Sequence, residues 1–199
     1  MSTKPTMHPV TEKLHRILTP RLVVTIGTKD PNGRANIIPI NNITSISTDP
    51  GMVIIAVYKP WITAQNLQRA TGFTISVPQR DQLELIWKLG QKFSGYASTR
   101  DKIDEFRHHF DLDFSEHGPV LVGAQGWLEC EIAGRPDDAG ANHYLVIGRF
   151  TKAAINPDLF NDQISPINHP KPFMQWDRNN FSEASDVFSV DYYKDTKLG

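Results

Sequence analysis

Residues 20–66 decide the fold, and they read PRLVVTIGTKDPNGRANIIPINNITSISTDPGMVIIAVYKPWITAQN. Residues 22–28 and 35–46 are rich in β-branched side chains, which favour strands. The turn between them, Asp-Pro-Asn-Gly at residues 30–33, combines a fixed φ at proline with a glycine that tolerates positive φ, so we expect a β-hairpin. Residues 52–58 are a nearly continuous apolar run, which predicts a strand covered on both faces.

Small polar side chains crowd the end of the second hairpin arm. The sequence there runs Asn41-Asn42-Ile43-Thr44-Ser45-Ile46-Ser47-Thr48, and the chain turns again at Asp49-Pro50-Gly51. The end of a buried strand would not normally carry so many hydroxyl and amide groups, because each would need a partner in the core. These side chains are therefore candidates to line a binding site.

An anion site is one interpretation of the segment that follows. The apolar run leads through Lys59 into a helix that we expect to begin at Thr63 or Ala64 and to end at Ala70. Free N–H groups at a helix start, the helix dipole and a lysine ammonium all favour a phosphate. In the alternative interpretation, Thr63 is only an N-cap and Lys59 is a solvated loop charge. The spacing alone does not separate the two.

The order of these segments resembles the flavin reductase-like, FMN-binding split-barrel family, which includes flavoredoxins and small NAD(P)H:flavin oxidoreductases. The likeness covers roughly Pro20 to Ala154, and no single motif in it is a strict signature. Beyond residues 20–66 it is carried by GFTISVP (72–78), LGQKFSGYASTRDKIDEF (89–106), WLECEIA (127–133) and NHYLVIGRF (142–150). The resemblance implies a mainly β fold with peripheral helices, namely a Greek-key antiparallel split β-barrel that binds FMN.

The other elements are expected from local patterns. Strands separated by short helices, with a late hairpin, favour an antiparallel barrel over a parallel sheet. The expected elements are a short amphipathic helix at Thr11–Leu18, a strand at Gly72–Val77, helices at Gln79–Leu89 and from Arg100 to about Phe110, long strands at Pro119–Ala133 and His143–Ile155, and a last strand at Val187–Tyr193. We therefore expect an arm at residues 1–19, the barrel domain at 20–155, and an extension at 156–199 that packs on the barrel or on a partner subunit.

Composition excludes several classes of protein. The chain has 199 residues, 22% of them charged, and a formal net charge of -1, which argues against a nucleic-acid binder or a basic membrane-surface protein. Residues 1–100 contain 12 Lys and Arg against 5 Asp and Glu, a balance that suits a phosphorylated ligand. The alternative is that folding interleaves the two halves and removes this asymmetry.

Cysteine and histidine give no sign of a metal site or a disulfide. Cys130 is the single cysteine and lies in an apolar run, where a buried, inert thiol is expected. His108 and His109 are adjacent and cannot share one helical face, so they are not expected to bind a metal. The N-terminus lacks the apolar core of a signal peptide and no apolar run reaches membrane-spanning length, so we expect a cytoplasmic protein.

The resemblance also implies a cofactor site. Family members are homodimers with FMN at the subunit interface. The corresponding ring-lining residues here are Asn41, Asn42, Ile43, Thr44 and Ser45; the phosphate and ribityl side is Tyr58, Lys59, Thr63 and Asn66; and Ser94 and Gly95 belong to a loop that approaches the flavin from the second subunit. His143 matches a histidine near the position where a nicotinamide or substrate stacks, although a surface histidine at a strand end is the alternative. Asn41 replaces the usual small residue, Pro50-Gly51 a frequent Pro-Pro, and Ala141-Asn142 a Gly-Asp pair.

The expected function follows from the cofactor. The first hypothesis is an FMN-dependent oxidoreductase of the flavin reductase type, in which hydride passes from NADH or NADPH to flavin and onward to a small-molecule or protein acceptor. The second is a flavoprotein electron carrier that a partner protein reduces, and the third is a β-barrel binding module without redox activity. No G-x-G-x-x-G motif for NAD(P)H occurs, but nicotinamide can stack directly on a flavin.

Overall fold

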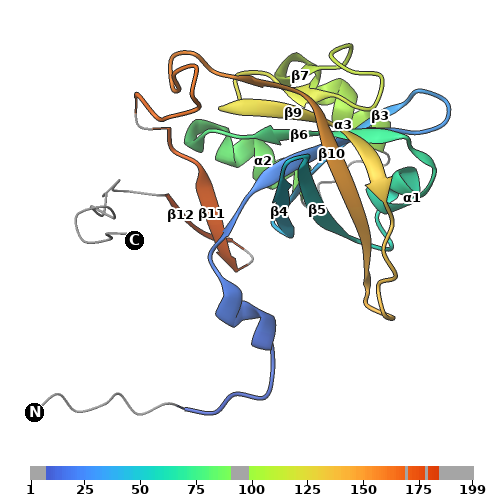
Figure 1. The fold of residues 1–199 in the computed structure, drawn as a ribbon, viewed down its shortest axis with the longest axis vertical. Helices are drawn as coiled ribbons and strands as arrows, with labels where there is room; N and C mark the ends of the chain where they lie inside the picture. Colours follow the sequence, from blue (N-terminus) through green and yellow to red (C-terminus); the bar gives the residue numbers. More distant parts are fainter. Residues whose placement is uncertain (1–7, 91–98, 169, 178, 184–199) are drawn as a thin grey trace, which may run out of the picture.

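The computed structural model describes residues 8–90, 99–168, 170–177 and 179–183 (Figure 1). Its main element is a seven-stranded antiparallel sheet in the order β3-β2-β6-β9-β10-β5-β4. The strands are β2 (Val24–Lys29), β3 (Ala35–Ile40), β4 (Ile43–Thr48), β5 (Gly51–Tyr58), β6 (Gly72–Val77), β9 (Gly126–Gly134) and β10 (His143–Ile155).

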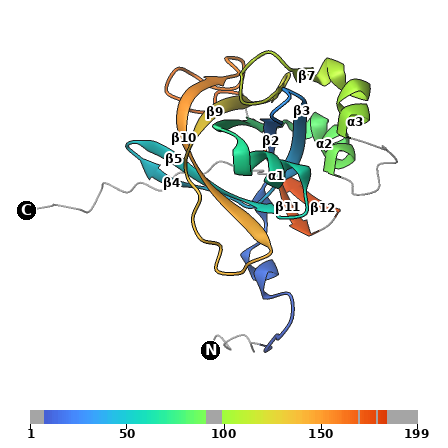
Figure 2. The ribbon, with the colours of Figure 1, turned by 90° about the vertical axis from the view of Figure 1, so that its right-hand side faces the viewer.

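The two outer strands of this sheet are consecutive in the chain. β3 and β4 lie at opposite ends of the strand order, yet only Asn41 and Asn42 separate them in sequence. A two-residue connection cannot span a flat sheet of this width, so the sheet must curl until its edges approach each other. Figures 1 and 2 show the sheet curled in this way around a single interior. The predicted antiparallel split barrel is confirmed.

The predicted hairpin at residues 30–33 is also confirmed. β2 pairs with β3 in register from Val24↔Ile40 to Lys29↔Ala35, and the amide of Asp30 donates to the carbonyl of Arg34. Gly33 has φ of +78°, a value that a residue with a side chain rarely adopts. Local chemistry therefore sets this turn.

Several expected elements are interrupted where the chain has to bend. The strand predicted at residues 35–46 breaks at Asn41-Asn42, and the one predicted at 119–133 divides into β8 (Val120–Leu121) and β9 with Gly123 at φ of +72° between them. β8 pairs with the short β7 (Phe110–Asp111). β5 alternates between buried and half-buried residues, so the expectation of a strand covered on both faces was wrong. The cause is the curled sheet: Val53, Ile55 and Val57 point into the barrel interior, while the alternate residues face outward and are only partly covered.

The first predicted helix and the one from Arg100 are shorter than the patterns predicted, while the other two have about the expected length. The helices are α1 (Ile62–Arg69), η2 (Arg80–Gln82) leading into α2 (Leu83–Gly90), α3 (Thr99–Glu105), and the 3-10 turns η1 (Leu14–Leu18) and η3 (Arg107–His109). η1 buries none of its residues, and Thr11 does not cap it. In both views η1 lies away from the body of strands (Figures 1 and 2). Among the residues described, no helix combines the length and apolar character needed to cross a membrane.

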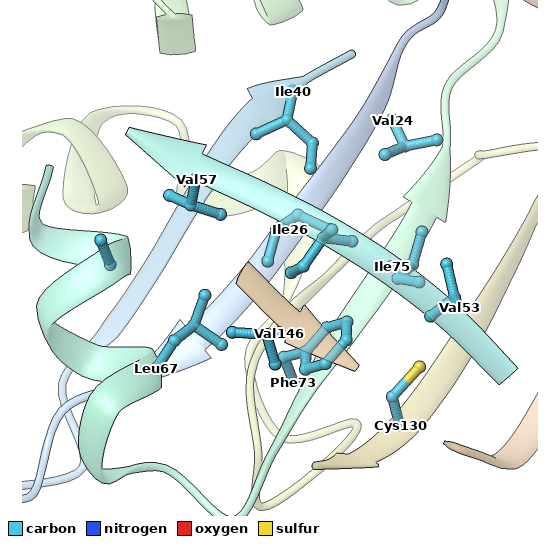
Figure 3. Packing of buried hydrophobic residues seen from close by; sticks show 12 residues of the cluster. Val24, Ile26, Ile40, Val53, Val57, Leu67, Phe73, Ile75, Cys130 and Val146 are labelled. Carbon is cyan, nitrogen blue, oxygen red and sulfur yellow. The ribbon is translucent and has the colours of Figure 1, made fainter. Parts of the chain in front are cut away.

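The barrel interior is one hydrophobic cluster. Val24, Ile26, Val57, Phe73 and Val146 are almost fully buried there, and Leu67 of α1 closes one side (Figure 3). Cys130 belongs to the same cluster, and burial raises the pKa of its thiol to about 12. The thiol is therefore protonated at neutral pH and unreactive, as predicted.

A second cluster lies between the sheet and the later helices. It joins Leu85, Ile86 and Leu89 of α2 to Ile37 of β3 and to Phe173. Phe173 begins β11 (Phe173–Asp177), which pairs with β1 (Arg21–Leu22) on one side and with β12 (Asn180–Glu183) on the other. The part of the extension that forms this hairpin, Phe173 to Glu183, is thus packed against α2 and β3 through Phe173. The strand expected at Val187–Tyr193 lies outside the described residues.

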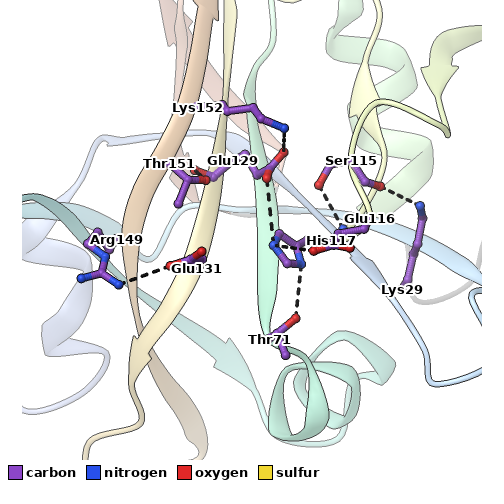
Figure 4. Close-up of polar contacts among 10 residues, drawn as sticks. All are labelled: Lys29, Thr71, Ser115, Glu116, His117, Glu129, Glu131, Arg149, Thr151 and Lys152. Carbon is purple, nitrogen blue, oxygen red and sulfur yellow. Dashed lines mark hydrogen bonds and ion pairs between the residues drawn. The ribbon is translucent and has the colours of Figure 1, made fainter.

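A polar cluster lies on the outside of β9, outside the cavities described below (Figure 4). The buried His117 ring lies 4.0 Å from Oε1 of Glu129 and 3.4 Å from Oγ1 of Thr71. Lys152 of β10 also approaches Glu129, with 3.4 Å between Nζ and Oε2. These contacts attach the 112–119 loop to the sheet. In the described part of the chain no three His, Cys, Asp or Glu side chains gather as a metal site would require.

Candidate functional site

Two adjoining cavities open where β3 ends and β4 begins. Their volumes are about 670 and 710 Å³, large enough for a cofactor. Both are lined by Asn41, Asn42, Ala56, His143 and Gln175, so they form one continuous depression. We call this depression the junction groove. It is bounded by the strand junction, the start of β10 and the β11–β12 hairpin.

The groove exists because the Asn41-Asn42 pair interrupts the sheet. The carbonyl of Asn42 accepts a hydrogen bond from the amide of Ala56 at 2.9 Å, which holds the interruption against β5. The side-chain amide of Asn41 donates to Oε1 of Gln175 at 2.8 Å, which joins the junction to β11. Two residues that are far apart in sequence thereby form the floor of one site.

One wall of the groove is aromatic. Trp61 comes from the start of α1, Trp87 from α2 and Phe181 from β12. All three line the more apolar of the two cavities, the one of about 670 Å³. Trp87 and Phe181 meet edge to face with their ring centroids 6.1 Å apart, while each tryptophan keeps 37% of its surface exposed. Partly exposed indoles that face a cavity provide a flat apolar surface, which suits a planar aromatic ligand.

His143, which the resemblance places near a nicotinamide or substrate, lines both cavities of the groove. It is the cross-strand partner of Tyr58, and the two ring centroids are 5.7 Å apart. Its Nδ1 lies 2.6 Å from Oδ1 of Asn142. In the tautomer that donates to this oxygen, Nδ1 carries the hydrogen and Nε2 keeps a lone pair. Burial and the nearby charge of Arg21 lower the pKa of His143 below 6.5. The imidazole is therefore neutral at pH 7.

Arg21 is a groove residue to which the sequence analysis assigned no role. It lies in β1 opposite Gln175, and its Nη1 donates to Oδ1 of Asn42. It lines the second cavity beside His15, Arg16 and Asp177. The signal was present, since a charged residue stands at the head of the apolar run after Pro20. Its importance depends on β11, which no local pattern placed beside it.

Thr63 and Asn66 do not reach the groove. Thr63 is fully buried and accepts a 2.6 Å hydrogen bond from Nδ2 of Asn36, and Asn66 donates to Oγ1 of Thr28 at 3.0 Å. The N-cap position of α1 is Trp61, so the interpretation of Thr63 as the N-cap was wrong. The two hydrogen bonds show that both side chains point toward β2 and β3. They attach α1 to the barrel.

Lys59 lies near the groove on the loop after β5. Its amide donates to the carbonyl of Asn142, the neighbour of His143, at 3.1 Å. Its Nζ lies 2.8 Å from Oδ2 of Asp138, and this hydrogen bond lowers the pKa of Asp138. An exposed ion pair contributes little stability, so a phosphate can compete with Asp138 for this lysine.

Ile43, Thr44 and Ser45 run along β4, away from the residues that line the cavities. Thr44 and Ser45 are exposed. β4 is an outer strand of the described sheet, so the backbone N–H groups on its free side have no partner within that sheet. Such groups are available to donate to the polar edge of a ligand. Ser94 and Gly95 lie outside the described residues.

The residues of the groove fit a flavin. An isoalloxazine ring needs a flat apolar surface and hydrogen-bond donors at its polar edge, and its phosphate needs a cation. The aromatic wall inside the groove supplies the first kind, and the free edge of β4 and Lys59, which lie beside the groove, supply the other two.

Comparison with known proteins gives the same indication. The chain is 29% identical over 132 residues to an "NADH-dependent FAD reductase" of Streptomyces globisporus, a match that spans about two thirds of each chain. Its fold is shared by a flavoredoxin of Methanosarcina acetivorans (TM-score 0.76, 15% identity, 96% of this chain and 97% of that one). It is also shared by an FMN-binding protein of Thermus thermophilus (TM-score 0.73, 19% identity, 96% and 100%). At these identities the two structures show the fold alone.

A family model matches almost the whole described chain. It is the model of the flavin reductase like domain, and it spans residues 14–183, from η1 to the end of β12. The barrel, the groove and the hairpin that borders the groove all lie inside this match. The chain therefore belongs to the flavin reductase like domain family.

Proposed function

We propose that the protein is an FMN-dependent oxidoreductase of the flavin reductase type, which takes hydride from NADH or NADPH and passes electrons to an acceptor. The observation that carries the proposal is the junction groove, in which an aromatic wall, a neutral histidine and nearby cations converge. Membership of the flavin reductase family and the relative named as an NADH-dependent FAD reductase support the same activity.

Different residues would hold different parts of the cofactor. Trp61 and Trp87 present the flat surface for the ring, and backbone N–H groups of the Asn41–Ser45 segment donate to its polar edge. Lys59 exchanges Asp138 for the phosphate. When bound, the flavin would supply the redox chemistry, that is, the capacity to accept hydride from a dihydronicotinamide. The protein then needs no nucleophile or metal of its own.

His143 positions the second substrate. Its ring contacts Tyr58 on one side and Asn142 on the other, and it lines the same cavity as Asn41. The lone pair on Nε2 can accept a hydrogen bond from an amide, such as the carboxamide of a nicotinamide. A neutral ring keeps this lone pair throughout the pH range above its lowered pKa.

A second copy of the chain completes the proposed enzyme. Apolar side chains on the N-terminal arm are exposed although they would be costly to leave in water; they are Val10, Leu14, Ile17 and Leu18, at 54–75% exposure. η1 lies away from the seven-stranded sheet and contacts its own chain through Arg16 and Asp177, so its apolar side chains remain available to a partner (Figure 1). We propose a homodimer with flavin near the interface, and sedimentation velocity measures its mass.

An absorbance spectrum tests the proposal. The purified protein is measured as isolated, after incubation with FMN or FAD and desalting, and after anaerobic addition of NADH or NADPH. Retained flavin that bleaches with either nucleotide supports the reductase and identifies the preferred donor. Flavin that stays oxidised indicates an electron carrier that a partner protein reduces. Protein that retains no flavin contradicts both and leaves a binding module without redox activity.

A further inference from the structure

The guanidinium of Arg21 has an unused edge. Its Nη1 donates to Oδ1 of Asn42, while its Nε is buried and has no hydrogen-bond partner. Nε and Nη2 form the side-on edge of a guanidinium, which binds two oxygens of a carboxylate, sulfonate or phosphate at once. Among the residues that the structure describes, nothing accepts a hydrogen bond from this edge. A buried donor without an acceptor is costly, and such donors are rare in native proteins.

The charge of Arg21 is also uncompensated. The one carboxylate that lines the same cavity, Asp177, lies 3.4 Å from Nη1 of Arg16 and accepts a second hydrogen bond from Asn180 at 2.6 Å. Within the described ranges no carboxylate lies at ion-pair distance from Arg21. His15, exposed on η1, adds a second imidazole to the same cavity beside His143. The cavity therefore favours an anion.

Arg21 lies next to the proposed flavin site, at the side of the second cavity. Arg21 touches Asn42, which lines both cavities, and its charge reaches His143, whose pKa it helps to lower. The second cavity has about 710 Å³ and joins the first along Asn41, Asn42 and His143. A molecule that stacks in the first cavity can extend its charged end into the second.

We propose that the Nε–Nη2 edge of Arg21 binds an oxyanion on the molecule that exchanges electrons with the flavin. The ligand class is a planar redox compound that carries a phosphate, carboxylate or sulfonate several ångströms from its reactive ring. The oxyanion site stands on the geometry of Arg21 alone, while its assignment to an electron-exchanging substrate rests on the proposed function.

Direct binding tests the site without reference to redox activity. Inorganic pyrophosphate is titrated into the purified protein by isothermal titration calorimetry, in the wild type and in Arg21→Gln. The expected result is saturable binding that weakens by about 10- to 100-fold in Arg21→Gln, as loss of a charge-assisted bidentate contact implies. Arg21→Lys keeps the positive charge but cannot donate two parallel hydrogen bonds, so its affinity for pyrophosphate should fall between those of the wild type and Arg21→Gln. Arg149→Gln is the control, because Arg149 is exposed and pairs with Glu131 on the outer face.

Kinetics with paired substrates identify the source of the oxyanion. One pair of donors is NADH and the neutral 1-benzyl-1,4-dihydronicotinamide; one pair of acceptors is 1,4-naphthoquinone-2-sulfonate and neutral 1,4-naphthoquinone. A rise in KM of about 10-fold for NADH alone in Arg21→Gln assigns the contact to the donor's phosphates. The same rise confined to the sulfonate assigns it to the acceptor.

Two results would overturn the proposal. One is pyrophosphate binding that is absent in the wild type or equal in Arg21→Gln. The other is a loss of turnover of equal size for the charged and neutral members of both pairs, which would mean that Arg21 only supports Asn42. A protein that binds pyrophosphate through Arg21 but retains no flavin would contradict the proposed function and leave the oxyanion site standing.

Discussion

The side chains of Asn36 and Thr63 are joined by a 2.6 Å hydrogen bond that is buried between β3 and α1. Neither side chain has access to water, since Asn36 is 3% exposed and Thr63 is fully buried. The bond therefore holds the first turn of α1 against the sheet. A residue that the resemblance associated with phosphate binding is used here for packing.

Replacing Thr63 with valine should destabilise the protein. The valine keeps the shape but leaves the amide of Asn36 buried without an acceptor, so we expect the free energy of unfolding to fall by about 1–3 kcal/mol. Urea denaturation measures this change. Thr63→Ser keeps the hydroxyl and is the control, expected to lose less. A Thr63→Val protein of normal stability that no longer retains flavin would return Thr63 to the phosphate site.

Replacing Lys59 with alanine should weaken FMN binding but leave the stability of the protein nearly unchanged. Its partner Asp138 is on the surface, so the free energy of unfolding should change by less than about 0.5 kcal/mol. Retention of FMN after desalting should fall, because the proposed phosphate cation is lost. Asp138→Asn should bind FMN more tightly, since Lys59 is then released from its competitor. Lys88→Ala, on the exposed face of α2, is the control. Equal FMN affinity in all four proteins would remove Lys59 from the site.

Replacing His143 with phenylalanine should slow flavin reduction more than it weakens flavin binding. The ring contact with Tyr58 can persist, while the hydrogen-bonding nitrogens are removed. Stopped-flow reduction by NADH, followed at the flavin absorbance, should be slower by about 10-fold or more. His117→Phe alters a histidine outside the groove and should leave this rate unchanged. A wild-type rate in His143→Phe would mean that His143 is only a strand-end residue.

Lys102 should make stability depend on pH above neutrality. Its Nζ is buried among α2, α3 and β3, where it donates to the carbonyls of Ile37 and Leu89, and burial lowers its pKa from 10.5 to about 8. Between these two values the unfolded chain holds a proton that the folded protein has released, so the free energy of unfolding rises with pH across this window. The rise is limited to about 3 kcal/mol.

The contribution of Lys102 is obtained as the difference in the free energy of unfolding between the wild type and a variant that lacks the amine. Urea denaturation at pH 7 to 10.5 is compared between the wild type and Lys102→Met, with Lys88→Met as the exposed control. The difference between wild type and Lys102→Met should grow in favour of the wild type as pH rises, and the Lys88 difference should stay flat. The comparison is needed because Cys130 acts in the other direction: its pKa is raised to about 12, so its contribution to stability falls above pH 9. A flat Lys102 difference would contradict the lowered pKa.

The sequence predicted those parts of the fold that depend on neighbours in the chain. The Asp30–Gly33 turn and the strand at His143–Ile155 were found because turn chemistry and strand composition are local signals. Asn41, Asn42 and His143 were assigned to the site through the family resemblance, and the structure brings all three to one groove. What they do there depends on partners that no local signal identifies.

The rest of the site could not be predicted, because it depends on the pairing of distant strands and on the direction in which side chains of α1 point. Arg21 lies beside Gln175 only because β1 pairs with β11, and Phe181 lies beside Gln175 because β12 pairs with β11. Residues as far apart as Arg21 and Gln175 leave no common pattern in the sequence. Thr63 and Asn66, which the resemblance assigned to the phosphate and ribityl side, form buried hydrogen bonds with Asn36 and Thr28. Side-chain direction turns by about 100° per helical residue, so it depends on how α1 packs on the barrel, which the sequence of the helix alone does not give.

The pairing of β1 with β11 also sets the order in which the site can form during synthesis. Arg21 leaves the ribosome early, but its register partner Gln175 is among the last residues of the described chain to follow. The barrel strands, which end at Ile155, can associate while the hairpin that borders the groove is still being made. A nascent or prematurely terminated chain would thus contain a barrel with half a binding site, and cofactor loading becomes a step that follows completion of the polypeptide.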